Sequence, residues 1–359
     1  MVKVGFASAD WSLTVTEEDG TPCMGGSGWI RIGQYSKYLK TNHVIGTLVY
    51  SKNAEVFGVT DTSGQHHLDC DIVYMQRWMM WDIPDNIRRA QANGQIIIND
   101  LDDWYWGLHH RHRAKVVLDP KNNKEENSDF YRQVLSFSDL VVVSTPFLAD
   151  NAKAVLGVKN LALLENCVDF DAYSPYRRKH VEGPIIVGWH GSTGHRSGDL
   201  DCLRSVYSSS DPERFSFHHT GHNSRNPLFW EEVGVEQSRV TLFPMVSPTK
   251  IPLMLTFDVG VAPLNDIPFN HAKSWIKPLE YIAAGVPFIA SKISEYVRLK
   301  QEYGAGRLAK KFIDWKKHLE RLSDPEVRQS EALANLEAVQ SLDVKQGALR
   351  LDKILESVR

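Results

Sequence analysis

Several features are scarce in this 359-residue sequence, and each absence narrows the class of protein. There are only four cysteines, and none are spaced as a CxxC pair, so a disulfide framework is not expected. We expect buried or free thiols in a reducing cytoplasm. No apolar run approaches the length of a membrane-spanning helix, and the opening residues, MVKVGFASAD, predict a short strand rather than a signal peptide. The sequence therefore predicts a soluble, cytoplasmic protein, with peripheral membrane contact left open.

An excess of charge of one sign is also absent. The chain has 41 Lys and Arg against 44 Asp and Glu, which gives a formal net charge of -3. This balance does not favour bulk attraction to DNA or to anionic lipid, although a local basic patch is still compatible with either. The composition, 42% hydrophobic and 24% charged, is typical of a globular protein, and the length allows two domains with separate cores.

Apolar runs alternate with helical patterns in a rhythm that restarts once, which predicts two Rossmann-like α/β domains. Before the restart, strands are expected at residues 2–7, 43–50, 71–76, 95–99, 139–144 and 161–166, and helices at 29–39 and 87–93. After it, strands are expected at 184–189, 215–219, 240–243, 257–264 and 287–290, followed by a helical tail from residue 314. We place an N-terminal domain at 1–170, a turn-rich linker at 171–183, a C-terminal domain at 184–335 and a terminal helix at 336–359.

The most informative stretch is FNHAKSWIKPLEYIAAGVPFIAS, residues 269–291. A polar loop leads into a short helix and then into a buried strand, which with the preceding apolar run is the pattern of a βαβ unit. Doubly wound folds bind ligands at such loops, beyond the carboxyl ends of the strands. The loop and helix carry Lys273, Ser274, Lys277 and Glu280. These groups suit a nucleoside diphosphate, because lysines attract phosphates and a carboxylate accepts from ribose hydroxyls. The alternatives are solvated lysines and a structural salt bridge at Glu280.

A second loop, HGSTGH at residues 190–195, follows the first strand of the C-terminal half. Gly191 and Gly194 allow a ligand to approach the backbone closely. His195 is a candidate donor to a phosphate or a sugar, or else a local cap. Lysines and helix N-termini can stabilise the charge of a diphosphate without a metal, so Lys273 and Lys277 are candidates for that task.

The segment NDLDDWYW, residues 99–106, is the most unusual part of the N-terminal half. Asp100, Asp102 and Asp103 end a predicted strand and are candidates for binding an acceptor or accepting its proton. Trp104 and Trp106 are candidates for stacking on a sugar. A turn with helix-capping aspartates is an equal alternative.

Two basic features allow more than one interpretation. The run HHRHRAK, residues 109–115, predicts an exposed basic helix, a contact to an acidic acceptor such as DNA, or a zinc tract, although no ordered ligand set accompanies it. Arg31 follows the glycine loop GGSG at residues 25–28, and it either faces a cleft or forms a surface salt bridge.

Together these motifs resemble the GT-B class of nucleotide-sugar glycosyltransferases, in particular the retaining family 4 and its relatives. In the C-terminal half the resemblance rests on GWHGSTGHRSGDL and NHAKSWIKPLEYIAAGVPFIAS. In the N-terminal half it rests on the glycine loop and on NCVD at residues 166–169, which is similar to the NGVD turn that closes the first domain. The resemblance implies a GT-B fold, with two Rossmann-like domains facing a central cleft and a helical tail that packs back toward the N-terminal domain.

The resemblance also implies roles for individual residues. The C-terminal domain would hold a UDP- or GDP-linked sugar, with Glu280 at the ribose hydroxyls, and the N-terminal domain would hold the acceptor. The family usually has a second glutamate eight positions earlier, where this chain has Ala272, so Asp266 and Asn270 become candidates for contacting the sugar. Met245 and Val246 fall where the base is read by main-chain groups. The predicted donor site is Gly191, Ser192, His195, Gly221, Val246, Asp266, Asn270, Lys273, Ser274, Lys277 and Glu280; the predicted acceptor site is Gly26, Arg31, Asp103, Trp104 and Trp106; the predicted catalytic residues are Asp100, Asp102 and Lys273.

The sequence thus predicts a glycosyltransferase that needs no metal or cofactor and retains the anomeric configuration. The acceptor class is open between a glycan, a protein, a lipid and a modified DNA base, and a glycosyltransferase acting on modified DNA bases is one alternative. A non-catalytic sugar-nucleotide-binding module is another, because Ala272 removes a usual polar group. Asp100 and Asp102 also spell the DxD signature of the GT-A class, which binds a divalent metal, but the C-terminal motifs and the two-domain rhythm argue against that class.

Overall fold

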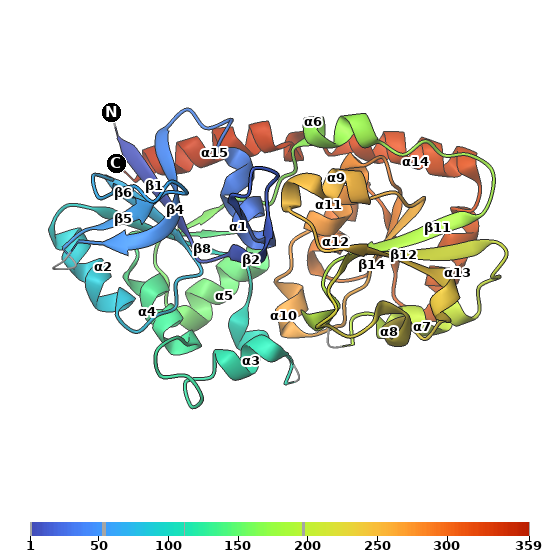
Figure 1. Ribbon diagram of the computed structural model, residues 1–359, viewed down its shortest axis with the longest axis horizontal. Coiled ribbons are helices and arrows are strands. Elements are labelled where there is room, and N and C mark those ends of the chain that lie inside the picture. The colour runs from blue at the N-terminus through green and yellow to red at the C-terminus, as the bar shows by residue number, and fades with distance from the viewer. Residues whose placement is uncertain (1, 52–54, 111, 196–197, 359) are drawn as a thin grey trace. The chain divides into compact units, whose positions relative to one another are not determined.

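The computed structural model describes residues 2–51, 55–110, 112–195 and 198–358, without the side chains of residues 12–14 and 195 (Figure 1). The chain forms two compact units. The first comprises the chain up to His110, Ala114–Cys167 and the segment from Val344 onward. The second comprises Val168–Asp343 together with His112 and Arg113.

The first unit is built on an eight-stranded sheet in the order β10-β9-β8-β7-β1-β4-β5-β6. The pairs from β10 to β4 are parallel, whereas β5 and β6 add antiparallel to the edge at β4. Apolar runs such as VVV and III are covered on both faces, as parallel strands require. The strands are β1 (Lys3–Ser8), β4 (Asn42–Tyr50), β5 (Phe57–Thr60), β6 (His66–His67), β7 (Ile72–Gln76), β8 (Ile96–Leu101), β9 (Leu140–Val143) and β10 (Leu161–Leu163).

Strand order in this sheet reverses at β1, which lies between β4 and β7. The parallel register pairs Ser8 with Gln76 and Gln76 with Asp100, so these three residues form a row at the carboxyl edge. Doubly wound sheets bind ligands at such a reversal, because the loops that follow the two strands leave in opposite directions and open a crevice between them.

Helices cover both faces of this sheet (Figure 1). Strand residues such as Phe6 and Ile98 share one core cluster with Leu351 and Leu355 of the terminal helix. The expected helix at 29–39 is instead a short helix followed by a 3-10 turn, because Ile32 leaves the helical region with φ of -132°. Sequence reasoning missed the antiparallel hairpin of β2 (Trp11–Thr16) and β3 (Pro22–Met24). The helices are α1 (Gly26–Arg31), η1 (Gly33–Tyr35), α2 (Ile83–Ala92), η2 (Tyr105–Gly107), α3 (Arg113–Val117), α4 (Ser128–Phe137), α5 (Pro146–Leu156) and α15 (Val344–Ser357).

The second unit is built on six parallel strands in the order β13-β12-β11-β14-β15-β16. In chain order this is 3-2-1-4-5-6, the order of dinucleotide-binding Rossmann sheets, with its reversal between β11 and β14. Five of the strands match the sequence expectation, whereas the three-residue β16 was not expected. The strands are β11 (Ile185–His190), β12 (Phe215–His222), β13 (Val240–Pro244), β14 (Val259–Ala262), β15 (Phe288–Ser291) and β16 (Arg307–Ala309).

The helices of the second unit bury two apolar clusters, one on each face of its sheet. The start of the segment expected as a linker is helical here, and the backbone N–H of Arg178 donates to Ala284 O. The helices are α6 (Phe170–Tyr173), η3 (Ser174–Tyr176), η4 (Thr193–His195), α7 (Asp201–Ser208), α8 (Phe229–Val233), η5 (Gln237–Arg239), η6 (Pro248–Lys250), α9 (Ile251–Met254), α10 (Pro268–His271), α11 (Ile276–Ala283), α12 (Ser294–Tyr303), α13 (Phe312–Arg321), α14 (Pro325–Ala338) and η7 (Gln340–Leu342).

Candidate functional site

Tyr281 of α11 fixes the two strand ends at the reversal of the second sheet. The backbone N–H of His190, at the end of β11, donates to the Tyr281 hydroxyl at 3.1 Å. That hydroxyl in turn donates to Val261 O of β14 at 3.1 Å. A Cβ on Gly260 would lie 2.5 Å from the Tyr281 ring, so glycine is needed there for the helix to pack this closely. One side chain therefore positions both loops of the predicted donor site.

Gly191 and Gly221 bring two loops of this edge into backbone contact. Both have positive φ, 148° and 110°, and a Cβ on Gly221 would lie 2.8 Å from Gly191 O. A Cβ on Gly191 would meet Lys277 Nζ at 3.0 Å. The ammonium group of Lys277 therefore lies directly beside the Gly191 backbone, where a phosphate could contact both.

His219 supports this loop from below as a neutral imidazole. Its ring packs against both Trp189 and Phe229, with centroid distances of 5.1 and 4.9 Å, and those two rings also stack on each other at 5.7 Å. Burial lowers the pKa of His219 to about 4. The neutral ring has one N–H, and Nε2 lies 2.8 Å from Gly191 O, so we assign the proton to Nε2 and the donated hydrogen bond to Gly191.

Glu280 is a buried carboxylate with few partners. It is 5% exposed, and the Tyr173 hydroxyl donates to its Oε1 over 3.4 Å, a long hydrogen bond. His190 Nδ1 lies 3.3 Å from Oε2, but without hydrogen-bond geometry. No Lys or Arg among the described residues forms an ion pair with Glu280, so the alternative of a structural salt bridge to one of these cations is not observed. Burying a carboxylate with so little compensation is costly, which is typical of a site that awaits a ligand with hydroxyl groups.

The two candidates for the missing sugar contact differ in their surroundings. Asn270 is buried, and its Nδ2 donates to Asp199 Oδ1 at 2.7 Å and to Asn265 O at 3.0 Å. It holds the loop after β14 against the start of α7. Asp266 has an 85% exposed side chain that lies 2.7 Å from His271 Nε2. Ala272 is fully buried, so no polar group takes the place of the family's second glutamate at that position.

The other donor candidates lie on the same loops. Lys273 Nζ lies 4.3 Å from the centroid of the Phe269 ring, and half-buried Ser274 immediately precedes Trp275, the N-cap of α11. Ser192 Oγ accepts from Asn226 Nδ2 at 3.0 Å. Val246 follows β13, the strand beside β12. The side chain of His195 lies outside the described residues.

In the first unit, Arg31 and Asp100 form a fully buried ion pair. Both side chains are 0% exposed, and Arg31 Nη2 lies 2.8 Å from Asp100 Oδ2. Arg31 also donates to Leu164 O and Asn166 Oδ1, and Tyr74 donates to Asp100 Oδ2. The expectation of a cleft-facing or surface Arg31 does not match this position. The hydrogen-bonding atoms of both side chains are occupied by each other and by neighbouring protein groups, and both side chains are shielded from solvent. We therefore assign the pair to the core and not to the acceptor site.

A second group of charges lies at the same edge but is only partly buried. Asp10 follows β1, Arg77 follows β7, and Asp102 and Asp103 follow β8, three neighbouring strands. Arg77 Nη1 lies 3.5 Å from Asp10 Oδ2, and Arg77 has a φ of 66°, which is uncommon for a residue with a side chain. Burial, followed by the charges of Asp103 and Asp100, raises the pKa of Asp102 to about 6, against the opposing effect of Arg77.

The glycine loop GGSG adjoins this charged group. The backbone N–H groups of Gly25 and Gly28 donate to the main chain and the carboxylate of Asp10, at 2.7 and 3.0 Å. A Cβ on Gly25 would lie 2.2 Å from Asp10 Oδ1, so the loop can approach only as glycine. A Cβ on Gly26 would meet nothing within 4 Å, which places Gly26 beside open space.

The aromatic residues of NDLDDWYW pack mainly on one another. The Trp104 and Trp106 rings lie 4.9 Å apart, and Trp106 stacks on Tyr131 with a centroid distance of 6.1 Å. Trp104 is buried, and Trp106 is partly buried. Because Asp100 is committed to Arg31, the two aspartates of the DxD motif do not converge on one point. The described residues contain no group of three or more His, Cys, Asp or Glu side chains arranged to hold a metal ion.

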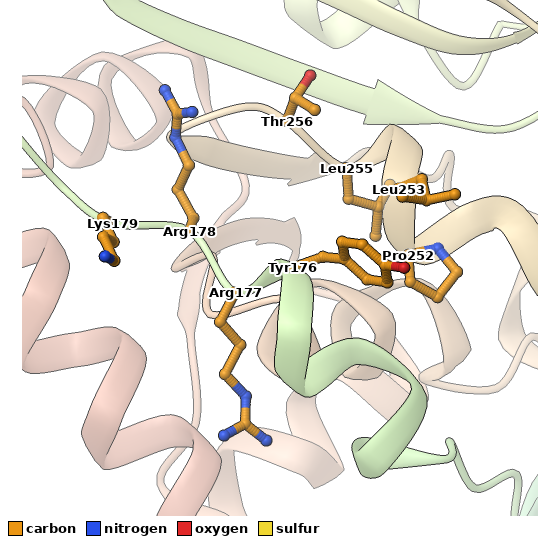
Figure 2. Close-up of a pocket in the computed structure, with 8 residues that line it drawn as sticks. All are labelled: Tyr176, Arg177, Arg178, Lys179, Pro252, Leu253, Leu255 and Thr256. Carbon is orange, nitrogen blue, oxygen red and sulfur yellow. The ribbon is translucent and has the colours of Figure 1, made fainter.

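A pocket of about 230 Å³ lies elsewhere in the second unit (Figure 2). Asp258, which precedes β14, binds Arg178 Nε at 2.8 Å and the backbone N–H of Ile186 at 2.9 Å. The pocket therefore lies at the amino edge of the sheet, opposite the loops described above. The side chains of Arg177 and Arg178 point away from one another in Figure 2 and do not converge on an anion. The lining residues are Tyr176, Arg177, Arg178, Lys179, Pro252, Leu253, Leu255 and Thr256.

Comparison with solved structures gives matches over nearly the whole chain. Sucrose-phosphate synthase from Thermosynechococcus elongatus matches with a TM-score of 0.66 at 14% identity, covering 100% of this chain and 99% of that one. A glycosyltransferase from Rickettsia africae matches with a TM-score of 0.66 at 12% identity, covering 99% and 98%. HepE of Anabaena, solved with UDP, matches with a TM-score of 0.62 at 14% identity, covering 99% and 100%. The chain has the GT-B fold.

The GT-B fold expected from the sequence is thus confirmed. No protein-family model matches the sequence, and no curated protein matches it. In this GT-B chain, each sheet carries its polar loops at the point where the strand order reverses. None of the described helices is long and apolar enough to cross a membrane.

Sequence reasoning missed four polar residues at these two edges. Asp10 and Arg77 were overlooked, although Arg77 directly follows a predicted strand and Asp10 lies three positions beyond the end of another, and these positions were a usable signal. His190 was included only as part of its loop. Tyr173 lies in the segment expected as a linker, and only the folded chain shows that it reaches Glu280.

Proposed function

We propose that this chain is a glycosyltransferase that transfers a sugar from a UDP-sugar to an acceptor hydroxyl or amine. The observation that carries the proposal is the under-partnered carboxylate of Glu280, which shares a strand reversal with Gly191, Gly221 and Lys277. Support for uridine as the base comes from HepE, a protein of the same fold solved with UDP and with UDP-glucose.

The donor would be held by groups of the second unit. The carboxylate of Glu280 would accept hydrogen bonds from the ribose hydroxyls, which replaces the water lost on burial. The diphosphate would lie beside the Gly191 backbone, with the ammonium group of Lys277 opposing its charge. Lys273 and Ser274 would lie toward the sugar end of the donor, as the family 4 resemblance suggests.

In the reaction, the bond between the anomeric carbon and the phosphate oxygen breaks, and the acceptor atom forms a bond to the same carbon. UDP leaves with the electron pair of the broken bond. The acceptor proton passes to the leaving phosphate, on the same face of the sugar, which gives retention of configuration. Lys277 stabilises the charge that develops on the phosphate, so this step needs no metal ion. Asp102 of the first unit would orient the acceptor by accepting a hydrogen bond from it.

Thermal denaturation in the presence of nucleotides tests the donor site. UDP at a hundred times its dissociation constant should stabilise the second unit by about 2.7 kcal/mol, and UDP should shift the midpoint more than GDP or ADP. Glu280→Gln should weaken UDP binding by about 10- to 100-fold, because a charged hydrogen-bond acceptor is lost. Glu302→Gln, on an exposed surface, should leave UDP binding unchanged.

Two results would contradict the proposal. One is the absence of any shift with UDP, GDP and ADP. The other is equal UDP binding by the wild type and Glu280→Gln. Release of UDP from UDP-glucose over an acceptor panel then separates an enzyme from a non-catalytic binding module, because only the enzyme turns the donor over.

A further inference from the structure

The charged group at the carboxyl edge of the first sheet has a formal excess of negative charge. Asp10, Asp102 and Asp103 contribute three negative charges and Arg77 one positive charge. The charges act on one another: Tyr105 first, and then Asp102, Asp10 and Asp103, raise the pKa of Arg77 against the opposing effect of burial, and Asp103 changes the pKa of Asp102 more than Arg77 does. At Asp102, burial and the neighbouring carboxylates together therefore outweigh the effect of Arg77.

Asp102 and the neighbouring Gln76 each have one buried polar atom with no hydrogen-bond partner within the described part of the chain. One is Asp102 Oδ1, an acceptor. The other is Nε2 of Gln76, a residue that is 0% exposed. The amide group of Gln76 lies at the base of the cluster, because its Oε1 accepts from Ser8 Oγ at 2.7 Å, and the same Oγ accepts from the backbone N–H of Asp10 at 3.0 Å.

Such atoms are costly unless something pairs with them. Asp102 Oδ1 needs a hydrogen-bond donor, and Gln76 Nε2 needs an acceptor. A hydroxyl group can supply both, because it donates one hydrogen bond and accepts others. An ammonium group supplies donors and gains from the negative potential. A phosphate offers acceptors only and would place two further negative charges beside the carboxylates.

From this geometry we propose that the cluster of Asp10, Gln76, Arg77, Asp102 and Asp103 binds an acceptor that presents hydroxyl or ammonium groups and rejects a phosphorylated one. The inference rests on the proposed function, because it takes the bound molecule to be the acceptor. It specifies what that function leaves open, namely the charge of the acceptor. Gly26 borders open space on the glycine loop whose Gly25 and Gly28 contact Asp10.

Matched sugar triplets provide the test. Glucose, glucosamine and glucose 6-phosphate are compared by saturation-transfer NMR on the full chain with saturating UDP, and mannose, mannosamine and mannose 6-phosphate form a second triplet. We expect the neutral and amino sugars to bind at least tenfold more tightly than the phosphate of the same triplet. In the double variant Asp102→Asn with Asp103→Asn, this preference should fall to within about threefold. Asp19→Asn, on an exposed loop of the same unit, should retain the full preference.

The inference is overturned if a sugar phosphate binds as tightly as its neutral counterpart. It is equally overturned if no neutral or amino sugar gives a signal that the double variant removes. The UDP-induced thermal shift, measured on the same samples, reports on the second unit alone. A normal UDP shift with either of these results would refute the acceptor inference and leave the proposed glycosyltransferase function intact, whereas loss of the UDP shift would refute that function.

Discussion

Two arginine–aspartate groups lie close together at the same edge of the first sheet, and they differ in almost every physical respect. Arg31 and Asp100 are fully buried, and three further groups, Leu164 O, Asn166 Oδ1 and the Tyr74 hydroxyl, complete the hydrogen bonding of the pair. Arg77 and Asp102 are partly exposed, and Asp102 Oδ1 is without a partner among the described residues. Only Leu101 separates the two aspartates in sequence.

This difference separates a structural pair from a binding group. A buried ion pair is tolerated when every lone pair and proton is satisfied, and it then locks the segments that it joins. An incompletely satisfied group raises the free energy of the empty site, and a ligand that supplies the missing hydrogen bonds recovers that energy. Residue type alone therefore does not distinguish the two groups. They differ in whether all their polar atoms have hydrogen-bond partners within the described protein.

The largest expected effect comes from removing one arginine of each group. Arg31→Met should lower the free energy of unfolding by about 3–5 kcal/mol, because it leaves Asp100 buried without its cation. Arg77→Met should lower it by less than about 1 kcal/mol, because the Arg77 side chain is 33% exposed. Urea denaturation followed by circular dichroism gives both values.

A double variant serves as the control for this first comparison. Arg31→Met combined with Asp100→Leu removes both charges, and most of the lost stability should return. Equal losses for Arg31→Met and Arg77→Met would remove the distinction between a structural pair and a binding group.

A smaller effect, of opposite sign, is expected at Asp102. Its pKa is raised from 3.8 to about 6, so the folded protein holds a proton that the unfolded chain releases between these values. The ionised carboxylate therefore destabilises the fold fully above pH 6 and not at all below pH 3.8. Asp102→Asn should raise the free energy of unfolding by about 1–2 kcal/mol at pH 8, and the gain should vanish by about pH 4.

Asp100→Asn is the matched change in the saturated group, and it should lower the stability at pH 8, because Arg31 then lacks its counter-charge. Thermal melts of both variants across pH 4–8 measure these effects. A destabilised Asp102→Asn at pH 8 would show that Asp102 is satisfied in the folded protein after all.

The smallest effect concerns two buried tyrosines. The Tyr131 hydroxyl donates to Asp100 O at 2.8 Å, so Tyr131→Phe should cost about 1 kcal/mol. The Tyr105 hydroxyl is buried without a partner in the described part of the chain, so Tyr105→Phe should be neutral or slightly stabilising. The midpoints of urea denaturation of the two variants test this difference. A larger loss of stability for Tyr105→Phe than for Tyr131→Phe would show that the Tyr105 hydroxyl is the one that forms the stabilising hydrogen bond.

Much of the fold was predictable because parallel strands are buried on both faces and so appear as apolar runs. The III and VVV runs of β8 and β9 are examples. The hairpin of β2 and β3 was missed because it is short and has no such run. The helix expected at 29–39 was overextended, because the conformational break at Ile32 has no strong sequence signal.

Residues of the candidate site could be predicted where their position along a βαβ unit places them in a loop at the carboxyl end of a strand. Glu280, Lys277 and Gly191 were named from such positions, and the structure brings them to one edge of the second sheet. The sequence does not show that the pair of Arg31 and Asp100 is structural and the group around Arg77 is not. Whether a charged side chain has hydrogen-bond partners within the protein depends on residues far away in sequence, such as Leu164 and Asn166 for Arg31.

The chain enters the second unit at Val168 and leaves it at Asp343, and these two residues form a β-bridge. Apart from His112 and Arg113, the second unit is thus an insertion in the first, with its ends side by side. During synthesis, α15 leaves the ribosome only after the whole of that insertion. The first core needs Leu351 and Leu355 to close, so the first unit must wait, with an open hydrophobic face, while the second completes its fold. The adjacent ends also make Val168–Asp343 the natural fragment to produce alone.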